Sequence, residues 1–455
     1  METYLAYTII VYLIGILFLG FILNRKVADE ADFLVGGRQF NLWLSTFSLF
    51  ATWFGAGTLI AATDEVAVIG LKATALEPYG AGFCLIFAGI FVAKPVWEMK
   101  LMTYADFFRN KFGTKVEAIS VFINIPIYVG WIAVQIISLA NILQVFFPIP
   151  LWILIISISM IAFILTSSGG MWSVSITDSV QLLVIIIGLI YLLIKILNVM
   201  PYGFEGLWGN IEQDQLVLIP AERAADLFNW LSVFSVAALG NITGQDLGQR
   251  MFSANSSKTA QRACFIAGFG YMSIGSIPVF LGLTAHQTLG EFSGSVIPLL
   301  IKQFLDPVTS VILTLTIISA VISTITSALL APASMLSHNF LKNYFPRTST
   351  LILCRYAVFV ISLLSIITAF AGENVYSLLE DSYAIGFVGF FVPFTIGLYS
   401  KKLNQTACLV AMIVSTLIWS FEFIFGGSFP YSLVAVLAGY PTYFVCYFNL
   451  QGKYC

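Results

Sequence analysis

The chain has 455 residues, of which 59% are hydrophobic and only 10% are charged, with a net charge of −2 and a mean hydropathy of +0.94. Soluble domains carry about 25% charged residues, so this composition excludes a water-soluble fold and indicates a membrane protein that crosses the bilayer many times. The small net charge gives no reason to expect nucleic acid as a partner. The expected partner is the lipid bilayer.

A spanning helix needs about 20 predominantly apolar residues, and this rule predicts thirteen spans joined by short loops. The first apolar run lacks the basic start and small-residue cleavage site of a signal peptide, so we expect it to be retained. The whole chain, 1–455, is expected to form a single membrane domain. The predicted spans are 4–24, 40–62, 70–97, 115–147, 149–167, 170–198, 226–252, 259–286, 306–341, 350–371, 375–400, 404–425 and 429–449.

The basic residues predict the orientation of these spans. Thirteen spans place the two termini on opposite sides of the membrane. With the N-terminus outside and the C-terminus cytoplasmic, all but four of the 21 Lys and Arg residues fall in inner loops or flanks. Because inner loops are enriched in Lys and Arg, we expect a multi-pass protein of the plasma (inner) membrane with this orientation. The four exceptions are Lys72, Lys195, Arg223 and Lys302.

The second predicted span is interrupted near its middle. Gly55 and Gly57 lie between Thr52 and Thr58, and glycine is unfavourable inside a helix. Within a membrane, unwound backbone is tolerated only where it is buried in protein or lines a watery cavity. The sequence therefore predicts a broken helix whose bare carbonyl groups and helix ends are available to an ion or a substrate.

A second interruption follows five spans later, at Gly240, Asn241, Gly244 and Gln245. Interruptions at equivalent positions in two five-helix halves indicate an inverted-repeat transporter, although glycine is common in membrane helices and a chance pairing is the alternative. The expected fold is an all-α polytopic membrane protein of the LeuT-like type, with a 5+5 inverted repeat and two broken helices. Its parts are an extra N-terminal helix and inner loop (4–39), a first repeat (40–198), a second repeat (226–400) and two extra C-terminal helices (404–449).

The ninth span places small and hydroxyl-bearing residues on one helical face, because they recur at offsets of three and four. One interpretation is a packing seam in which hydroxyl groups bond back to their own helix. The other is a cation site, since hard cations prefer oxygen ligands and Ser323 and Thr324 are neighbouring hydroxyls. The face consists of Thr316, Ala320, Ser323, Thr324, Ser327, Ala331 and Ser334.

Acidic residues within the apolar runs are the remaining polar candidates. Asp178 lies about 12 Å into the sixth span, counted at 1.5 Å per residue. An acid at that depth costs about 2.5–3.5 kcal/mol unless it faces a polar interior. We therefore treat Asp178 as a candidate for cation coordination or proton relay, the alternative being a boundary acid solvated from the inner side. Glu77 lies near the outer end of the third span, where we expect solvent to surround it.

Five segments in order resemble the sodium/solute symporter family, which includes sodium-coupled proline, pantothenate, sugar and high-affinity choline carriers. Together they extend over about residues 30–400. The segments are Phe33–Arg38, Ala51–Phe54, Ser168–Gln181, Gln245–Ala254 and Ala320–Thr324.

This resemblance implies sodium as the coupling ion and no organic cofactor. It implies a principal sodium site formed by the carbonyl groups of Ala51, Phe54 and Ala320 with the hydroxyl groups of Ser323 and Thr324. The residues of a second sodium site in some relatives are also present, as Asp178, Thr326 and Ser327. The substrate is expected at the two breaks. The expected substrate-binding residues are Trp53, Gly55, Thr58, Trp131, Asn241, Gly244 and Gln245.

Within the family, Val92–Pro95, Ala51–Trp53 and Trp131 resemble the high-affinity choline branch most. Aromatic rings suit a quaternary ammonium, because their faces attract a cation that offers no hydrogen bonds. The chain departs from that branch at Gly244 and Ala81, where the choline carriers place a cage tryptophan and a cage tyrosine. Proline-like or carboxylate substrates, held at helix N-termini, stay open.

We therefore predict a sodium-coupled secondary active symporter that imports a small polar organic solute by alternating access, as a monomer or a weak homo-oligomer. The alternatives are a proton-coupled carrier of the same fold that uses Asp178 as its relay, and a transporter-like sensor or channel. No enzymatic activity is expected, because the sequence contains no nucleotide-binding loop, metal-ligand spacing or nucleophile–base pair above chance.

Overall fold

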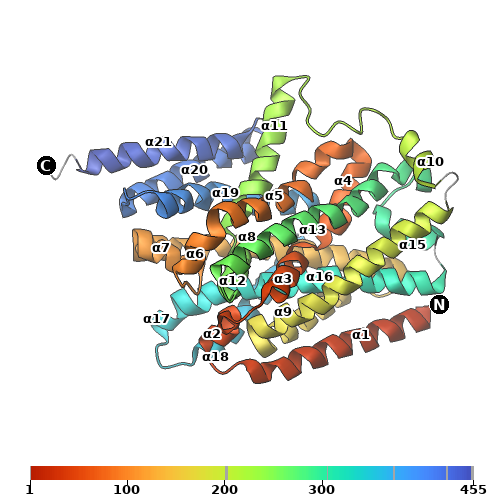
Figure 1. The fold of residues 1–455 in the computed structure, drawn as a ribbon, viewed down its shortest axis with the longest axis horizontal. Coiled ribbons are helices and arrows are strands. Elements are labelled where there is room, and N and C mark those ends of the chain that lie inside the picture. The colour runs from red at the N-terminus through yellow and green to blue at the C-terminus, as the bar shows by residue number, and fades with distance from the viewer. Residues whose placement is uncertain (1, 200–202, 305, 372–374, 427–428, 452–455) are drawn as a thin grey trace.

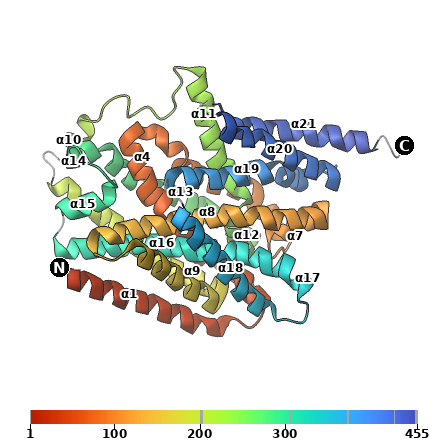
Figure 2. The ribbon, with the colours of Figure 1, turned by 180° about the vertical axis from the view of Figure 1, so that it is seen from behind.

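The computed structural model describes residues 2–199, 203–304, 306–371, 375–426 and 429–451. These residues form a bundle of helices, and their only extended pairing is an isolated bridge between Phe40 and Ala254. The two termini lie at opposite ends of the long axis (Figure 1). Helices α1 (Glu2–Leu23) and α21 (Tyr431–Gln451) lie on opposite flanks of the bundle in both ribbon views (Figure 2).

The remaining helices follow in chain order. The α-helices are α2 (Glu30–Val35), α3 (Leu42–Trp53), α4 (Ala62–Ile69), α5 (Tyr79–Phe87), α6 (Ala93–Glu98), α7 (Tyr104–Phe112), α8 (Thr114–Phe146), α9 (Leu151–Val199), α10 (Gly203–Gly209), α11 (Ala224–Ser235), α12 (Gln245–Ser253), α13 (Ser257–Leu283), α14 (Ala285–Leu289), α15 (Val296–Phe304), α16 (Pro307–Met335), α17 (Lys342–Tyr344), α18 (Thr350–Ala371), α19 (Val375–Tyr399) and α20 (Gln405–Phe425). The π-helical segments are η3 (Gly57–Ala61), η5 (Ala88–Val92), η6 (Val236–Gly240) and η8 (Leu336–Leu341), and the 3₁₀ segments are η1 (Asn24–Lys26), η2 (Gly36–Arg38), η4 (Gly70–Ala75) and η7 (Asn241–Thr243).

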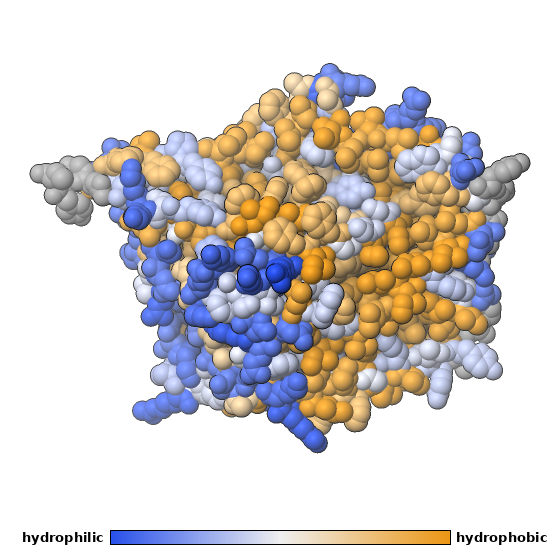
Figure 3. Space-filling view, viewed as in Figure 1, coloured by the Kyte–Doolittle hydropathy of each residue, from blue (hydrophilic) through white to orange (hydrophobic). Residues whose placement is uncertain are grey.

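Eleven helices in the described part of the chain are long and apolar enough to cross a membrane. The difference from the predicted thirteen comes from continuity between neighbouring helices. Residues Gly57–Glu98 run together from the second predicted span into the third, and Leu151–Asn198 contains both the fifth and the sixth. Exposed apolar side chains such as Ile14 on α1, Ile187 on α9 and Leu417 on α20 face outward. Figure 3 shows the resulting apolar belt, with hydrophilic residues gathered toward the ends.

Helix α9 reverses direction at Gly170, whose φ of 52° and ψ of −137° are not helical. The hydroxyl group of Thr166 donates to the carbonyl group of Thr326 at 3.2 Å, and that of Ser327 donates to Asp178 at 3.1 Å. In one straight helix, residues 166 and 178 would be about 18 Å apart, yet both meet the same turn of α16. The predicted connection between the fifth and sixth spans is therefore present, at a residue whose positive φ favours glycine.

The first predicted break is confirmed. Helix α3 begins after Asn41, whose side chain accepts a hydrogen bond from the N–H group of Leu44 at 2.9 Å. It ends at Trp53, because Phe54 leaves the helical region with a ψ of 72°. The chain resumes as a π-helix at Gly57 and continues into α4.

The second predicted break is also confirmed. The π-helix η6 ends at Gly240, a single 3₁₀ turn follows, and Gly244 is extended with a ψ of 128° before α12 begins. The segment that resumes after the first break contacts α13, α19 and α8, and the segments at the second break contact α19 and α5. The unwound backbone is therefore enclosed by protein, as a lipid environment requires.

Candidate functional site

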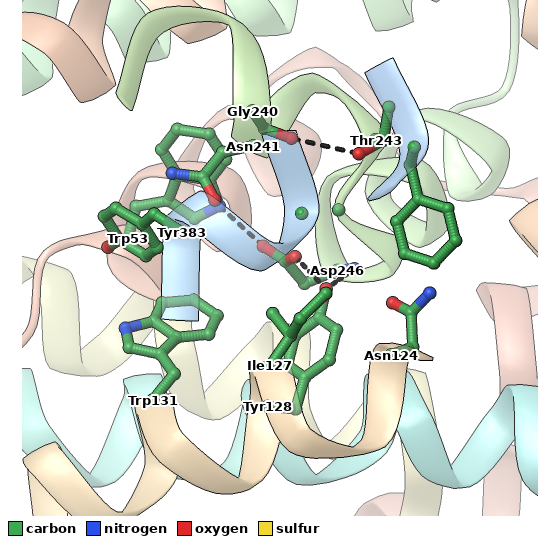
Figure 4. Close-up of a pocket in the computed structure, with 13 residues that line it drawn as sticks. Trp53, Asn124, Ile127, Tyr128, Trp131, Gly240, Asn241, Thr243, Asp246 and Tyr383 are labelled. Atoms are coloured by element: carbon green, nitrogen blue, oxygen red, sulfur yellow. Dashed lines mark hydrogen bonds between the residues drawn. The ribbon is translucent and has the colours of Figure 1, made fainter. Parts of the chain in front are cut away.

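The two breaks meet through the side chain of Asp246, at the start of α12. The indole Nε1 of Trp53, the last residue of α3, donates to Oδ2 of Asp246 at 2.6 Å (Figure 4). The hydroxyl group of Tyr128 on α8 donates to Oδ1 and accepts from the N–H group of Asp246 at 2.9 Å. Both carboxylate oxygens therefore accept a hydrogen bond, one from the first broken span and one from α8.

A pocket opens beside this carboxylate, and aromatic rings form much of its wall. The ring of Trp131 lies 5.8 Å from that of Tyr128 and 6.4 Å from that of Tyr383, measured between centroids. The cavity measures 20 Å³, which is room for about one water molecule. A larger solute therefore enters only after the surrounding helices move apart. The lining residues are Trp53, Asn124, Ile127, Tyr128, Trp131, Gly240, Asn241, Thr243, Gly244, Asp246, Tyr383, Gly386 and Phe390.

Four of the five residues expected to bind sodium lie together beside the first break. The hydroxyl group of Ser323 on α16 is 3.1 Å from the carbonyl oxygen of Ala51 and 3.0 Å from that of Ala320. The hydroxyl group of Thr324 is 3.5 Å and 3.0 Å from the same two oxygens. All four residues are fully buried. The fifth, Phe54, is the residue at which the helix unwinds.

Asp178, expected as a ligand of a second sodium ion, is fully buried and forms an ion pair with Arg250. Its Oδ2 lies 3.3 Å from Nη2 of Arg250 on α12, and accepts hydrogen bonds from Ser48 and Ser327 at 3.1 Å each. The hydroxyl group of Thr326 donates to the carbonyl group of Ser323 in its own helix. The alternative of a solvated boundary acid is wrong, because Asp178 is 0% exposed.

The residues expected to bind substrate divide into two groups. Trp53, Trp131, Asn241 and Gly244 line the pocket. The other three, Gly55, Thr58 and Gln245, do not line the pocket and instead contact neighbouring helices. A Cβ atom on Gly55 would lie 2.6 Å from the hydroxyl oxygen of Thr324. Gln245 accepts from the N–H group of Tyr104 and donates to Ser334, and Thr58 donates to Glu77.

Sequence reasoning missed three side chains at this site. Asp246 lies two residues beyond Gly244, so an acid just after an unwound glycine was an available signal. Tyr128 and Tyr383 offered none, because 15% of the chain is aromatic. The expectation that solvent surrounds Glu77 is wrong, because this residue is only 2% exposed.

Two interrupted helices that meet at a small enclosed pocket, within a bundle of apolar helices, define the broken-helix class of solute transporters. The chain belongs to the sodium:solute symporter family, whose family model matches residues 33–415. Membership makes the protein a sodium-coupled solute symporter, in agreement with the resemblance seen in its motifs.

Relatives and solved structures agree with this assignment. The human high affinity choline transporter 1 is 28% identical over 467 aligned positions, covering 97% of this chain and 78% of the human protein. The Drosophila melanogaster high-affinity choline transporter 1 is 26% identical, covering 90% and 69%. A solved Na⁺-coupled sialic acid symporter in its outward-open state matches with a TM-score of 0.85 at 17% identity, covering 97% of each chain. The nucleobase-cation symporter Mhp1 matches with a TM-score of 0.62 at 15% identity, covering 90% and 93%. The last two likenesses show the LeuT-like fold.

Proposed function

We propose that this symporter carries a small organic cation together with sodium, and imports both by alternating access across the plasma membrane. The observation that carries the proposal is the buried carboxylate of Asp246, held where the two breaks meet. A charge inside a membrane protein is costly unless it is paired. The carboxylate has hydrogen-bond donors in Trp53 and Tyr128 but no cationic side chain within ion-pair distance among the described residues.

The wall of the pocket fits the same chemistry. Ring faces attract cations, and the rings of Trp53, Trp131 and Tyr383 border the cavity. The named choline transporters among the relatives support an ammonium group as the recognised feature. Gly244 and Ala81 leave two aromatic positions of a choline cage empty, and Asp246 supplies negative charge on the side of Gly244. A carboxylate substrate fits less well, because it would face the like charge of Asp246.

We propose that sodium binds between the carbonyl groups of Ala51, Phe54 and Ala320 and the hydroxyl groups of Ser323 and Thr324. Sodium there ties the first break to α16 and orients Trp53 toward the pocket. The coupling is reciprocal, so the solute must also tighten sodium binding. The membrane potential contributes about 2.3 kcal/mol per charge per 100 mV to import.

A second sodium ion at Asp178, Thr326 and Ser327 requires Arg250 to leave the carboxylate, because its guanidinium group lies 3.3 Å from Oδ2. We therefore propose one sodium ion for the closed state.

The movement that opens the site rocks the spans containing α3 and α12 against the rest of the bundle. The two inverted repeats are assigned to residues 40–198 and 226–400. The N-terminus is assigned to the outside, the C-terminus to the cytoplasm, and the working unit to a monomer or weak homo-oligomer.

The test is uptake in proteoliposomes with an imposed sodium gradient, using choline, betaine, proline, pantothenate, sugars and carboxylates. We expect saturable, sodium-stimulated uptake of choline or another ammonium compound. Asp246→Asn should lower that uptake at least tenfold, as expected for about 1.4 kcal/mol of lost interaction. Asp226→Asn is the matched control, because Asp226 lies on α11 of the same broken span and forms an exposed ion pair with Arg223.

Three outcomes contradict parts of the proposal. Uptake restricted to neutral or anionic solutes contradicts the substrate class. Uptake in sodium-free medium that follows pH supports the proton-coupled alternative with Asp178 as relay. Flux that cannot accumulate solute against its gradient supports a channel or sensor.

A further inference from the structure

A second buried carboxylate, outside the proposed sodium site, lies beside the first break. Glu77 precedes α5 and is 2% exposed. Its Oε2 accepts hydrogen bonds from Tyr271 on α13 at 2.6 Å and from Thr58 in η3 at 3.0 Å. Its Oε1 accepts from Tyr383 on α19 at 3.1 Å. Three separate helical elements therefore converge on one acid.

The oxygen contacts around Glu77 outnumber the available hydroxyl protons. Besides Oε2, the hydroxyl group of Tyr271 contacts that of Thr58 and lies 3.0 Å from the carbonyl oxygen of Trp53. The four oxygens of this cluster make four close contacts, but Tyr271 and Thr58 supply only two protons. If both protons point at an ionised Glu77, no proton is left for the contact between Tyr271 and the Trp53 carbonyl oxygen. A proton on Oε2 frees the Tyr271 proton for that carbonyl.

The charge surroundings point the same way. No Lys, Arg or His lies within ion-pair distance of Glu77 in the part of the chain that the structure describes. The titratable groups facing the cluster are Tyr271 of α13, Tyr383 of α19 and Cys84 of α5, with Asp246 of α12 beyond Tyr383. Each of these groups is neutral or negative at neutral pH. An ionised Glu77 would therefore be an unpaired charge inside the membrane, which is costly.

A metal ion does not account for the cluster. A cation of the size of Ca²⁺ holds its oxygen ligands at about 2.3–2.6 Å. In an octahedral shell, neighbouring ligand oxygens are then about 3.4 Å apart. The hydroxyl oxygen of Tyr271 lies only 2.6 Å from Oε2 of Glu77. That separation is typical of an O–H···O hydrogen bond to or from a carboxyl group.

The cluster contacts both the break and the substrate pocket. Tyr271 reaches the carbonyl oxygen of Trp53, the residue whose indole group holds Asp246. Tyr383 reaches Glu77 through its hydroxyl group and lines the pocket with its ring. Any movement of α19 that widens the pocket also removes a donor from Glu77 and admits water to it.

We propose that Glu77 is a proton-binding site, which is protonated in the closed state and releases its proton to water when α19 moves away. The O–H bond of the carboxyl group breaks, the proton passes to a water molecule, and the carboxylate keeps the electron pair. The proton is thus a second coupling ion of the transport cycle, separate from sodium and from Asp178.

The first test is infrared difference spectroscopy of the full chain in lipid, without substrate. At neutral pH, the wild-type protein minus Glu77→Gln should show the carbonyl stretching band of a protonated carboxylic acid. The control is Glu65→Gln, at a half-buried acid of α4 in the same broken span, which should retain that band. A difference spectrum that contains an ionised carboxylate band in its place overturns the proposal.

A second variant keeps the test independent of folding. Tyr271→Phe removes one hydroxyl group while leaving Glu77 in place, and should shift the frequency of the band. An unshifted band means that the protonated group is not a Glu77 carboxyl group bonded to Tyr271, which contradicts the proposal. Glu77→Gln should fold like the wild type, because an amide has the shape of the protonated acid, so a variant that fails to fold also contradicts the proposal.

The transport consequence is measured separately in proteoliposomes. Sodium-driven uptake of choline should change with pH in the wild type and become independent of pH in Glu77→Gln. Equal pH dependence in both proteins contradicts a role in the cycle. The infrared result needs neither sodium nor solute, so it stands even if the organic-cation proposal fails.

Discussion

The guanidinium group of Arg250 lies 3.3 Å from the carboxylate of Asp178, and neither side chain is more than 1% exposed. Arg250 also donates to the carbonyl groups of Ser48 and Asp246, and to the hydroxyl group of Ser327. One side chain therefore joins both broken spans to α9 and α16. This ion pair has to rearrange if the broken spans move away from the other two helices.

Removing one partner of this pair should destabilise the protein strongly. Arg250→Gln leaves the Asp178 carboxylate buried without its cation, which costs about 3–5 kcal/mol. Thermal unfolding in detergent should show a large fall in midpoint. The double variant Asp178→Asn/Arg250→Gln should lose much less than the sum of the two single variants, because it leaves no unpaired charge. Additive losses would mean that the two groups do not act as a pair.

The sodium dependence of uptake should respond to the two hydroxyl groups of α16. Ser323→Ala and Thr324→Ala each remove a hydroxyl group of the proposed sodium site, with an expected loss of about 1–3 kcal/mol, which is about 5- to 150-fold in the half-saturating sodium concentration. Thr314→Ala is the matched control, because among the described residues that buried hydroxyl group bonds to the Ser310 carbonyl of its own helix and to no other group. Unchanged sodium dependence in both site variants contradicts the assignment.

Gly55 should tolerate no side chain. A Cβ atom there would lie 2.6 Å from the Thr324 hydroxyl oxygen and would also collide with Oε1 of Gln135. Gln135 accepts a hydrogen bond from the N–H group of Ala56 at 2.7 Å. A collision with Gln135 therefore displaces the backbone of the break. We expect Gly55→Ala to weaken sodium-dependent uptake at least tenfold, a loss of about 1.4 kcal/mol.

Gly389→Ala is the control for this substitution. It adds the same methyl group at a buried glycine whose Cβ would have an ordinary contact of 3.5 Å with Ile123. If the two alanine variants transport equally well, close approach at Gly55 is not required.

Stability should fall on the acid side because of two carboxylates outside the membrane spans, Glu30 and Asp106, which share His338 at the end of a span as their partner. Burial raises the pKa values of Glu30 and Asp106, but hydrogen bonds and attraction to His338 outweigh burial and leave both pKa values below their ordinary 4.5 and 3.8. With lowered folded-state pKa values, the stabilisation is fully present above the ordinary values. It is lost as pH falls through the lowered ones.

Thermal unfolding measured against pH tests this expectation. His338→Gln should lower the midpoint at neutral pH and reduce the further fall in acid, because Glu30 and Asp106 lose a shared partner. His286→Gln provides the comparison, since His286 lies exposed in α14. An acid profile that is identical in His338→Gln and the wild type excludes the cluster as the cause.

The class of fold and the places where helices break were predictable, because both depend on local properties. Apolar runs define spans through their length, and glycine pairs weaken a helix wherever they occur. The count of eleven differs from the predicted thirteen because Gly57–Glu98 and Leu151–Asn198 are each one helical stretch, the second of which turns at Gly170. The neighbours of Ser323 and Thr324 were indicated only through the family resemblance, because nothing local states that α16 lies against Ala51.

The sequence by itself determined that this is a membrane bundle with two interrupted spans and a row of hydroxyl groups on one central helix. Only the tertiary structure decided the partners of the buried charges: Arg250 for Asp178, Trp53 and Tyr128 for Asp246, and three hydroxyl groups for Glu77. The reason is physical. Backbone propensity and hydropathy act over a few neighbouring residues, whereas the partner of a buried charge is set by packing between segments far apart in the chain.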